Sequence, residues 1–244
     1  LAGENRPKDE SAFKVVNTEL TEFLCDALRA NGRKIPLILA SSIQAEQNNL
    51  YGKSKLKAEC VVRSLADETG IPIYIYRLPG VFGKWCKPNY NSVVATFCYN
   101  ISRNIPIQIN DQSVLIKLVY VDDVVSDFIR VIQQEGDVIS MPEVKLEYSI
   151  TLGKLAEQIT AFQNCRNNLI TERVGSGLVR ALYSTYMSYL PPEQFAYDLP
   201  RHSDERGIFV EMLKTKDSGQ FSFFTAHPGV TRGCHYHHSK TEKF

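Results

Sequence analysis

Short apolar runs alternate with helical segments in the first part of the chain, and this alternation constrains the fold more than any other feature. The runs at residues 35–40 (IPLILA) and 71–76 (IPIYIY) are short and continuous, which is typical of strands buried in a parallel sheet. The helical segments have apolar side chains on one side, and Thr151 is the expected N-cap of the last one. Strands are predicted at 35–40, 71–76 and 114–121, and helices at 11–30, 50–69, 122–132 and 151–159. This order predicts an α/β fold with a doubly wound parallel sheet.

The pattern changes near residues 189–193 (YLPPE). The segments at 206–213 and 220–225 have strand character and are punctuated by Gly and Pro, and a strand that carries histidines is expected to follow them. We therefore predict two domains. Residues 1–190 form an α/β domain, and residues 191–244 form the beginning of an all-β domain.

The last residues contain an H-x-H-x4-E pattern made by His235, His237 and Glu242. Two histidines two residues apart on a strand point to the same face, and a carboxylate a few residues later can bind the same ion. This set of nitrogen and oxygen ligands suits a divalent metal, with zinc preferred. The alternative is a solvated histidine-rich tail. Because the sequence stops two residues after Glu242, we expect a metal site that is begun here and completed by a ligand beyond it.

A second candidate site contains Tyr51 and Lys55, four residues apart on one face of a predicted helix. A nearby ammonium is expected to lower the pKa of a tyrosine from its usual value of about 10. Such a pair could protonate an alkoxide as hydride arrives. The spacing alone is weak evidence, and we regard its second occurrence, Tyr236 to Lys240, as accidental. Ser42 strengthens the case because it lies at the carboxyl end of a predicted strand, where an open parallel sheet binds its ligands.

Residues 1–190 resemble the extended short-chain dehydrogenase/reductase family, a Rossmann-type family whose members act on nucleotide sugars with a nicotinamide cofactor. The resemblance rests on Ser42, on Tyr51 and Lys55, and on residues 77–83 (RLPGVFG) and 119–123 (VYVDD). It implies that Ser42 polarises a sugar ketone, that Tyr51 is the acid/base and that Lys55 binds the nicotinamide ribose.

The same resemblance implies NADP or NAD as the cofactor and a UDP-sugar as the substrate. Asn17 matches the asparagine that this family carries on a helix. The implied cofactor contacts are Leu1, Ala2, Tyr51 and Lys55, and also Leu78, Pro79, Gly80 and Val81 through their backbone.

The sequence departs from the family in two places. None of the fourteen glycines forms a G-x-x-G-x-x-G or G-x-G-x-x-G loop, so we expect the pyrophosphate-binding loop to lie before Leu1 and the α/β domain to be incomplete at its N-terminus. Nucleotide-sugar dehydratases of this family carry Asp-Glu directly after the hydroxyl residue, where this sequence has Ile43 and Gln44. Neither residue is an acid or a base, which argues against dehydration.

The tail resembles the first motif of a cupin. A reductase domain followed by a cupin is similar to the bifunctional enzymes of capsular-polysaccharide synthesis. This resemblance implies NADPH-dependent C4 reduction of a UDP-4-keto-6-deoxy-HexNAc and C3 epimerisation by the cupin half, in the UDP-N-acetyl-L-fucosamine pathway. Two alternatives remain open: an NAD-dependent nucleotide-sugar C4 epimerase with a structural cupin, and a non-catalytic sugar-nucleotide-binding protein.

Charge and cysteine content narrow the choice of partners. The net charge is +1 and the basic residues are dispersed, which argues against nucleic acid or a membrane surface as a partner. No signal peptide and no run of eighteen apolar residues is found, and the six cysteines are scattered. We expect a cytoplasmic protein with reduced thiols that forms a homodimer.

Overall fold

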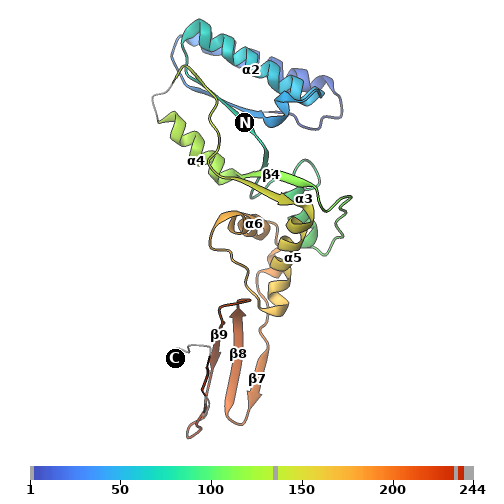
Figure 1. Ribbon diagram of the computed structural model, residues 1–244, viewed down its shortest axis with the longest axis vertical. Helices are drawn as coiled ribbons and strands as arrows, with labels where there is room; N and C mark the ends of the chain where they lie inside the picture. The colour runs from blue at the N-terminus through green and yellow to red at the C-terminus, as the bar shows by residue number, and fades with distance from the viewer. Residues whose placement is uncertain (1–2, 134–136, 234–235, 239–244) are drawn as a thin grey trace. The chain divides into compact units, whose positions relative to one another are not determined.

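Figure 1 shows the computed structural model, which describes residues 3–133, 137–233 and 236–238. The chain forms two compact units. One contains residues 1–96 and 109–153, and the other contains residues 97–108 and 154–244. The domain boundary at residue 190 stays a prediction.

The first unit contains a three-stranded parallel sheet, with strand order β1-β2-β5. Its strands are β1 (Leu37–Ser42), β2 (Ile73–Leu78) and β5 (Ile139–Ser140). Strands β1 and β2 each extend two residues beyond the predicted run, so Ser42 and Leu78 are the last residues of paired strands and lie opposite each other in the ladder. A parallel sheet in an α/β unit confirms the predicted fold class.

Helix α2 (Leu50–Thr69) has the bounds that the sequence predicts. It begins where the Asn49 side chain accepts a hydrogen bond from the backbone N–H of Gly52, and it ends at Gly70, which has a φ of 67°. Beneath it, Val62 and Leu65 pack against Ile73 and Ile75 of β2 in a core with no exposed surface. Burial of this apolar face attaches the helix to the sheet.

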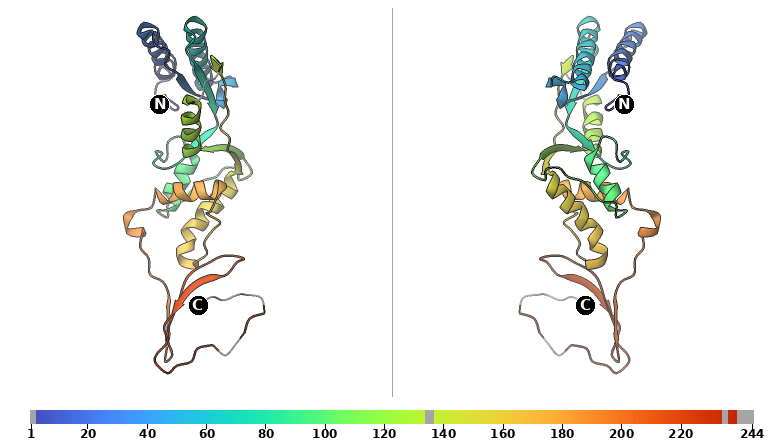
Figure 2. Two further views of the ribbon diagram at one scale, coloured as in Figure 1. Left: turned by 90° about the vertical axis from the view of Figure 1, so that its left-hand side faces the viewer. Right: turned by 90° about the vertical axis from the view of Figure 1, so that its right-hand side faces the viewer.

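The predicted helix at 11–30 has two parts, a π-helix (Phe13–Glu19) followed by α1 (Leu20–Asn31). Helices α1 and α2 lie side by side (Figure 2), and Arg29 donates a hydrogen bond to Glu68 across them. The side that faces the interior carries Asn17 and Thr18, which are adjacent in the sequence and both buried. The apolar side chains on one side of this helical segment are partly exposed, with Phe23 72% exposed.

A second sheet of the same unit has the order β3-β4-β6. It consists of β3 (Gly80–Phe82), β4 (Leu115–Tyr120) and β6 (Glu147–Thr151), and α4 (Val121–Ile132) follows β4 directly. Strand β3 is parallel to β4, whereas β6 is antiparallel to it. The sequence did not predict β6, whose polar and apolar residues form an edge strand with intermediate exposure. Thr151, the expected N-cap, is the last residue of β6, and α5 (Leu152–Asn168) begins immediately after it.

The second unit contains most of α5, helix α6 (Gly177–Met187) and an antiparallel sheet with strand order β7-β8-β9. Helix α3 (Val93–Ile101) begins in the first unit and ends in the second. The strands are β7 (Arg201–Asp204), β8 (Gly207–Lys214) and β9 (Gln220–Phe224). Strands β8 and β9 confirm the predicted β segments. The short β7 (RHSD) was missed because it has no apolar residue. The histidine-bearing strand is wrong for residues 236–238, which have no strand structure, and the residues on both sides of them lie outside the described part of the chain.

Candidate active site

The carboxyl end of β1 and the first turns of α2 bring the three predicted catalytic side chains together. Tyr51 and Lys55 occupy one face of α2, and the Tyr51 phenol is hydrogen bonded to Ser42. Lys55 is only 9% exposed, and its Nζ donates a hydrogen bond to the carbonyl oxygen of Ala40 over 3.1 Å. The same nitrogen lies 5.7 Å from the centroid of the Tyr51 ring. A hydroxyl, a phenol and an ammonium therefore lie within one small region.

The pKa values of Tyr51 and Lys55 differ from the expectation that the lysine lowers the pKa of the tyrosine. Burial raises the pKa of Tyr51, and the hydrogen bond from Ser42 opposes this shift only in part. Burial also lowers the pKa of Lys55. The lysine does not lower the pKa of the phenol as expected, because burial dominates and the ammonium donates to Ala40 instead. In the protein alone, Tyr51 is a neutral acid that holds its proton firmly.

Gly52 allows the loop after Ser42 to approach α2 closely. A Cβ atom at this position would lie 2.1 Å from the carbonyl oxygen of Gln44 and 2.8 Å from that of Gln47, so no larger residue fits without displacing backbone. Ser42 itself caps the short 3-10 helix η2 (Ile43–Glu46) by accepting from the backbone N–H of Gln44. Sequence reasoning missed Gly52. The available signal was a glycine inside a helix, where it is unfavourable without a packing reason.

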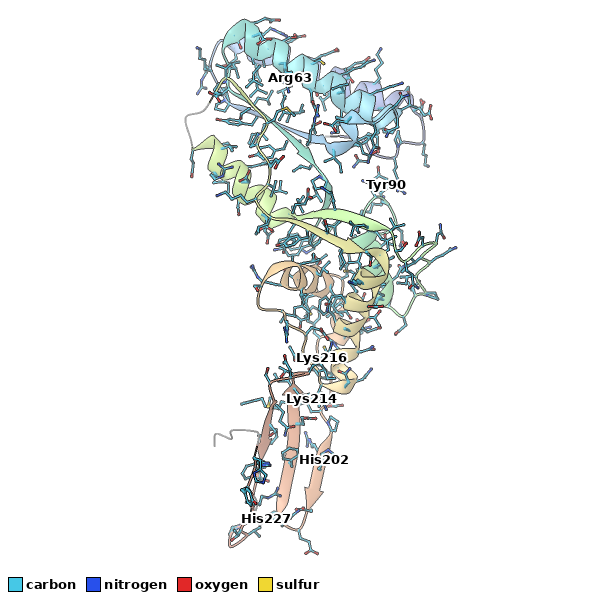
Figure 3. All side chains as sticks on the ribbon, viewed as in Figure 1. Arg63, Tyr90, His202, Lys214, Lys216 and His227 are labelled. Carbon is cyan, nitrogen blue, oxygen red and sulfur yellow. The ribbon has the colours of Figure 1, made fainter. Side chains whose placement is uncertain are left out.

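The π-helix supplies a polar anchor beside Lys55. Asn17 donates to the Ser54 hydroxyl and to the carbonyl oxygen of Glu4, each over 3.0 Å, and accepts from the Glu4 N–H over 2.8 Å. The Glu4 carboxylate in turn accepts a hydrogen bond over 2.6 Å from Tyr90, which is labelled in Figure 3. A Cβ added to Gly3 would lie 3.5 Å from the Lys55 nitrogen, so the backbone of residue 3 passes directly beside it. Leu1 and Ala2, two of the expected cofactor contacts, lie outside the described residues.

The remaining expected cofactor contacts connect β2 to β3. Leu78 is the last residue of β2, opposite Ser42, while Gly80 and Val81 are exposed at the start of β3. A Cβ on Gly80 would approach the Leu118 side chain to 3.1 Å, so the glycine allows β3 to pack closely on β4. The segment therefore leaves the sheet at the edge where Ser42 lies, which is where open α/β sheets bind their ligands.

The predicted metal ligands are only partly within the described structure. His237 is described and exposed, whereas His235 and Glu242 lie outside the described residues. Within the described ranges, no three His, Cys, Asp or Glu side chains form a group that could hold a metal. The zinc site stays a prediction.

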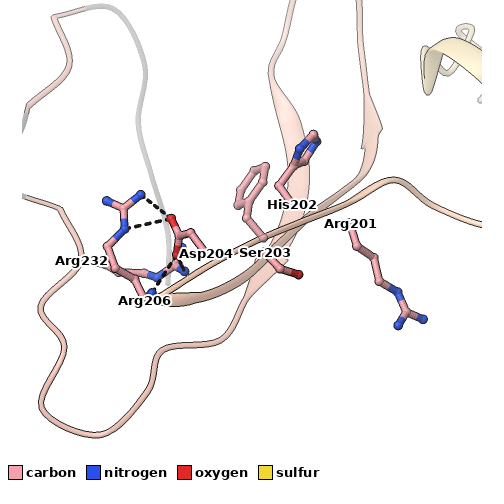
Figure 4. Close-up of a pocket in the computed structure, with 7 residues that line it drawn as sticks. Arg201, His202, Ser203, Asp204, Arg206 and Arg232 are labelled. Carbon is pink, nitrogen blue, oxygen red and sulfur yellow. Dashed lines mark hydrogen bonds and ion pairs between the residues drawn. The ribbon is translucent and has the colours of Figure 1, made fainter.

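The described part of the second unit also has an open pocket beside β7 (Figure 4). Its charged residues centre on Asp204, which pairs with Arg206 over 2.6 Å and with Arg232 over 3.4 Å. Both arginines lower the pKa of Asp204, and the hydrogen bond from Arg206 is the larger cause. The pocket is lined by Arg201, His202, Ser203, Asp204, Arg206, Phe209 and Arg232. Sequence reasoning did not single it out.

The fold agrees with the comparisons to known proteins. The model of the NAD dependent epimerase/dehydratase family matches residues 3–141, which is more than half of the chain, and the chain belongs to this family. A second model, the polysaccharide biosynthesis C-terminal domain, matches residues 202–244. No described helix has both the length and the apolar character needed to cross a lipid bilayer.

Three individual proteins are similar to this chain. A UDP-2-acetamido-2,6-beta-L-arabino-hexul-4-ose reductase of Pseudomonas aeruginosa is 62% identical over 245 residues, which is 100% of this chain and 66% of the relative. The crystal structure of the capsular polysaccharide assembling protein CapF from Staphylococcus aureus has a TM-score of 0.86 and 44% identity, over 98% of this chain and 65% of that one. The chain thus spans slightly less than two thirds of both relatives. A UDP-glucuronic acid 4-epimerase from Bacillus cereus in complex with NAD has a TM-score of 0.65 and 15% identity, over 78% of this chain and 72% of that one, and shows the shared fold alone.

Proposed function

We propose that the whole protein reduces C4 of a UDP-4-keto-6-deoxy-HexNAc with NADPH, in the pathway to UDP-N-acetyl-L-fucosamine and capsular polysaccharide. The observation that carries this proposal is the convergence of Ser42, Tyr51 and Lys55 at the carboxyl end of β1. The similarity to a UDP-sugar reductase and to CapF supports the choice of substrate.

The residues present fit a nicotinamide cofactor. Lys55 has three N–H donors and gives one of them to Ala40, so others can bind the hydroxyl groups of a ribose. The backbone of Gly3 lies close to this ammonium. A Cβ atom at residue 3 would lie 3.5 Å from Lys55 Nζ and would occupy part of the space beside it. Lys55 and the backbone of residues 78–81 would hold the nicotinamide half of NADP or NAD. When bound, the cofactor supplies the hydride.

The three side chains divide the remaining chemistry between them. Ser42 would donate a hydrogen bond to the C4 carbonyl oxygen and hold the ketone beside Tyr51. Tyr51 would transfer its phenolic proton to that oxygen as C4 is reduced. The raised pKa of Tyr51 keeps this proton in place at neutral pH until negative charge develops on the substrate oxygen. The hydrogen bond from Ser42, which lowers the pKa of Tyr51, would then stabilise the phenolate until solvent returns a proton.

The C-terminal domain is proposed to epimerise C3 of the keto sugar before reduction. A ketone at C4 acidifies the proton at the neighbouring carbon, and reduction of the ketone afterwards prevents reversal. The match of residues 202–244 to a polysaccharide biosynthesis domain supports this assignment. In the complete domain, His235, His237 and Glu242 are proposed to hold a zinc ion. A homodimer and a cytoplasmic location remain part of the proposal.

The test is product analysis with full-length protein, NADPH and a UDP-4-keto-6-deoxy-HexNAc. We expect one NADPH to be consumed for each sugar and the product to gain two hydrogen atoms, as seen by mass spectrometry. Interconversion of C4 epimers without net NADPH consumption would favour the epimerase alternative. Binding of the nucleotide sugar without conversion would favour the non-catalytic alternative.

A further inference from the structure

Glu59 is a buried charge that the proposed reaction does not use. It lies on α2 and is only 1% exposed. Burial of an isolated carboxylate is unfavourable, so a position of this kind must be satisfied by specific partners.

The partners of Glu59 come from the carboxyl ends of β1 and β2. Ser41 of β1 donates its hydroxyl to Oε1 of Glu59 over 2.5 Å. Arg77 of β2 donates from Nη2 to Oε2 over 2.8 Å, and from Nε to both oxygens over 3.0 and 3.2 Å. Ser41 and Arg77 are partners in the β1–β2 ladder, so one carboxylate bridges two neighbouring strands.

Glu59 lies on the same helix face as the candidate active-site residues. Tyr51, Lys55 and Glu59 are spaced by four residues and share a face of α2. Three consecutive residues of β1 meet this face. Lys55 donates to the carbonyl oxygen of residue 40, Glu59 accepts from residue 41, and Tyr51 is hydrogen bonded to residue 42.

We propose that Glu59 is a positioning residue. It fixes where α2 lies relative to the carboxyl ends of β1 and β2, and this in turn fixes the position of Tyr51 relative to Ser42. Charge-assisted hydrogen bonds to a buried carboxylate add geometric specificity to the apolar packing between the helix and the sheet. Arg77 leads directly into residues 78–81, so the same carboxylate also fixes the start of the proposed cofactor contact. This inference rests on the proposed reduction.

The experiment compares three Glu→Gln variants of the full-length protein. Glu59→Gln keeps the size of the side chain and removes its charge. Glu46→Gln removes the other partner of Arg77, which binds over 2.6 Å but is 73% exposed. Glu68 lies on the same helix as Glu59, and Glu68→Gln removes an ion pair with Arg29 of α1 in which the carboxylate is 53% exposed. The measurements are kcat, the KM for NADPH and for the sugar, and the melting temperature.

We expect Glu59→Gln to lower kcat by about 10- to 100-fold, because misplacement of reacting groups acts on the transition state. The KM for NADPH and the KM for the sugar should each change less than about threefold. Both control variants should stay within about twofold of wild type, since exposed ion pairs contribute little. A Glu59→Gln variant with wild-type kcat, or with only KM raised, would overturn the inference.

The double variant Glu59→Gln with Arg77→Gln separates positioning from stability. It removes both charges of the buried pair, so the melting temperature should recover relative to the single variant while kcat stays low. Recovery of kcat together with the melting temperature would show a purely structural role and overturn the inference. A wild-type protein that does not reduce the sugar would instead reject the proposed function itself.

Discussion

At the scale of single residues, the proposed reaction depends on the proton of Tyr51. Replacement of Tyr51 by Phe should lower C4 reduction by about 10²- to 10⁴-fold, the usual contribution of a positioned general acid, while substrate binding changes little. Steady-state NADPH oxidation checks this outcome in the full-length protein. Tyr236→Phe is a matched control because it removes the same hydroxyl from the other Y-x-x-x-K pattern, at a side chain that is 79% exposed. Near wild-type turnover in Tyr51→Phe would remove Tyr51 from the mechanism.

Lys55 has a pH signature of its own. Burial lowers the pKa of Lys55 in the folded protein below its ordinary value of 10.5, so the unfolded chain binds more protons between the lowered pKa and 10.5. The penalty for burying the ammonium is therefore full below the lowered pKa and disappears as the pH rises toward 10.5. We expect the free energy of unfolding of wild type, relative to Lys55→Met, to increase with pH across that window.

Denaturant unfolding at several pH values measures this difference. Tyr51 titrates in both proteins, so its own pH dependence largely cancels in the comparison. A difference that stays constant with pH would show that burial does not shift the ionisation of Lys55.

At the scale of elements, the site depends on the close contact between α2 and η2. Gly52→Ala would place a Cβ 2.1 Å from a backbone oxygen of η2, the element that Ser42 caps. We expect a loss of about 1–3 kcal/mol in the free energy of unfolding, as for overpacked sites, together with reduced turnover. Gly175→Ala is the control, since nothing lies within 4 Å of the added atom. Equal stability of the two variants, measured by urea unfolding, would contradict the close packing.

At the scale of the whole molecule, the two proposed activities belong to different parts of the chain. His235→Ala should abolish zinc binding by the full-length protein, because removal of one imidazole breaks the proposed ligand set. Elemental analysis of purified protein measures the metal. His227→Ala is the control, a described and exposed histidine outside the pattern. Equal zinc in His235→Ala and wild type would defeat the assignment, whereas loss of zinc with C4 reduction preserved would place the metal in the C-terminal half.

The sequence alone predicted those features that depend on residues within one segment of the chain. Helix α2 lies at the predicted residues because the Asn49 cap, the apolar spacing and Gly70 are all encoded within one segment. The placement of Tyr51 and Lys55 on one face follows from their spacing, and the α/β class follows from the order of the segments.

Only the tertiary structure decided features that depend on residues distant in the chain. Strand β6 forms because it pairs with β4, which is distant in the chain. The apolar side of α1 is partly exposed, whereas the polar Asn17 is buried. The pKa of Tyr51 rises because packing removes water from around the phenol, which its neighbours in the sequence do not reveal. Glutamate usually lies on the solvent-exposed face of a helix, so the sequence gives no sign that Glu59 is buried. Its burial results from Ser41 and Arg77, each 18 residues away on a different strand, because hydrogen bonds can hold a charge in the interior only after the fold has brought their donors together.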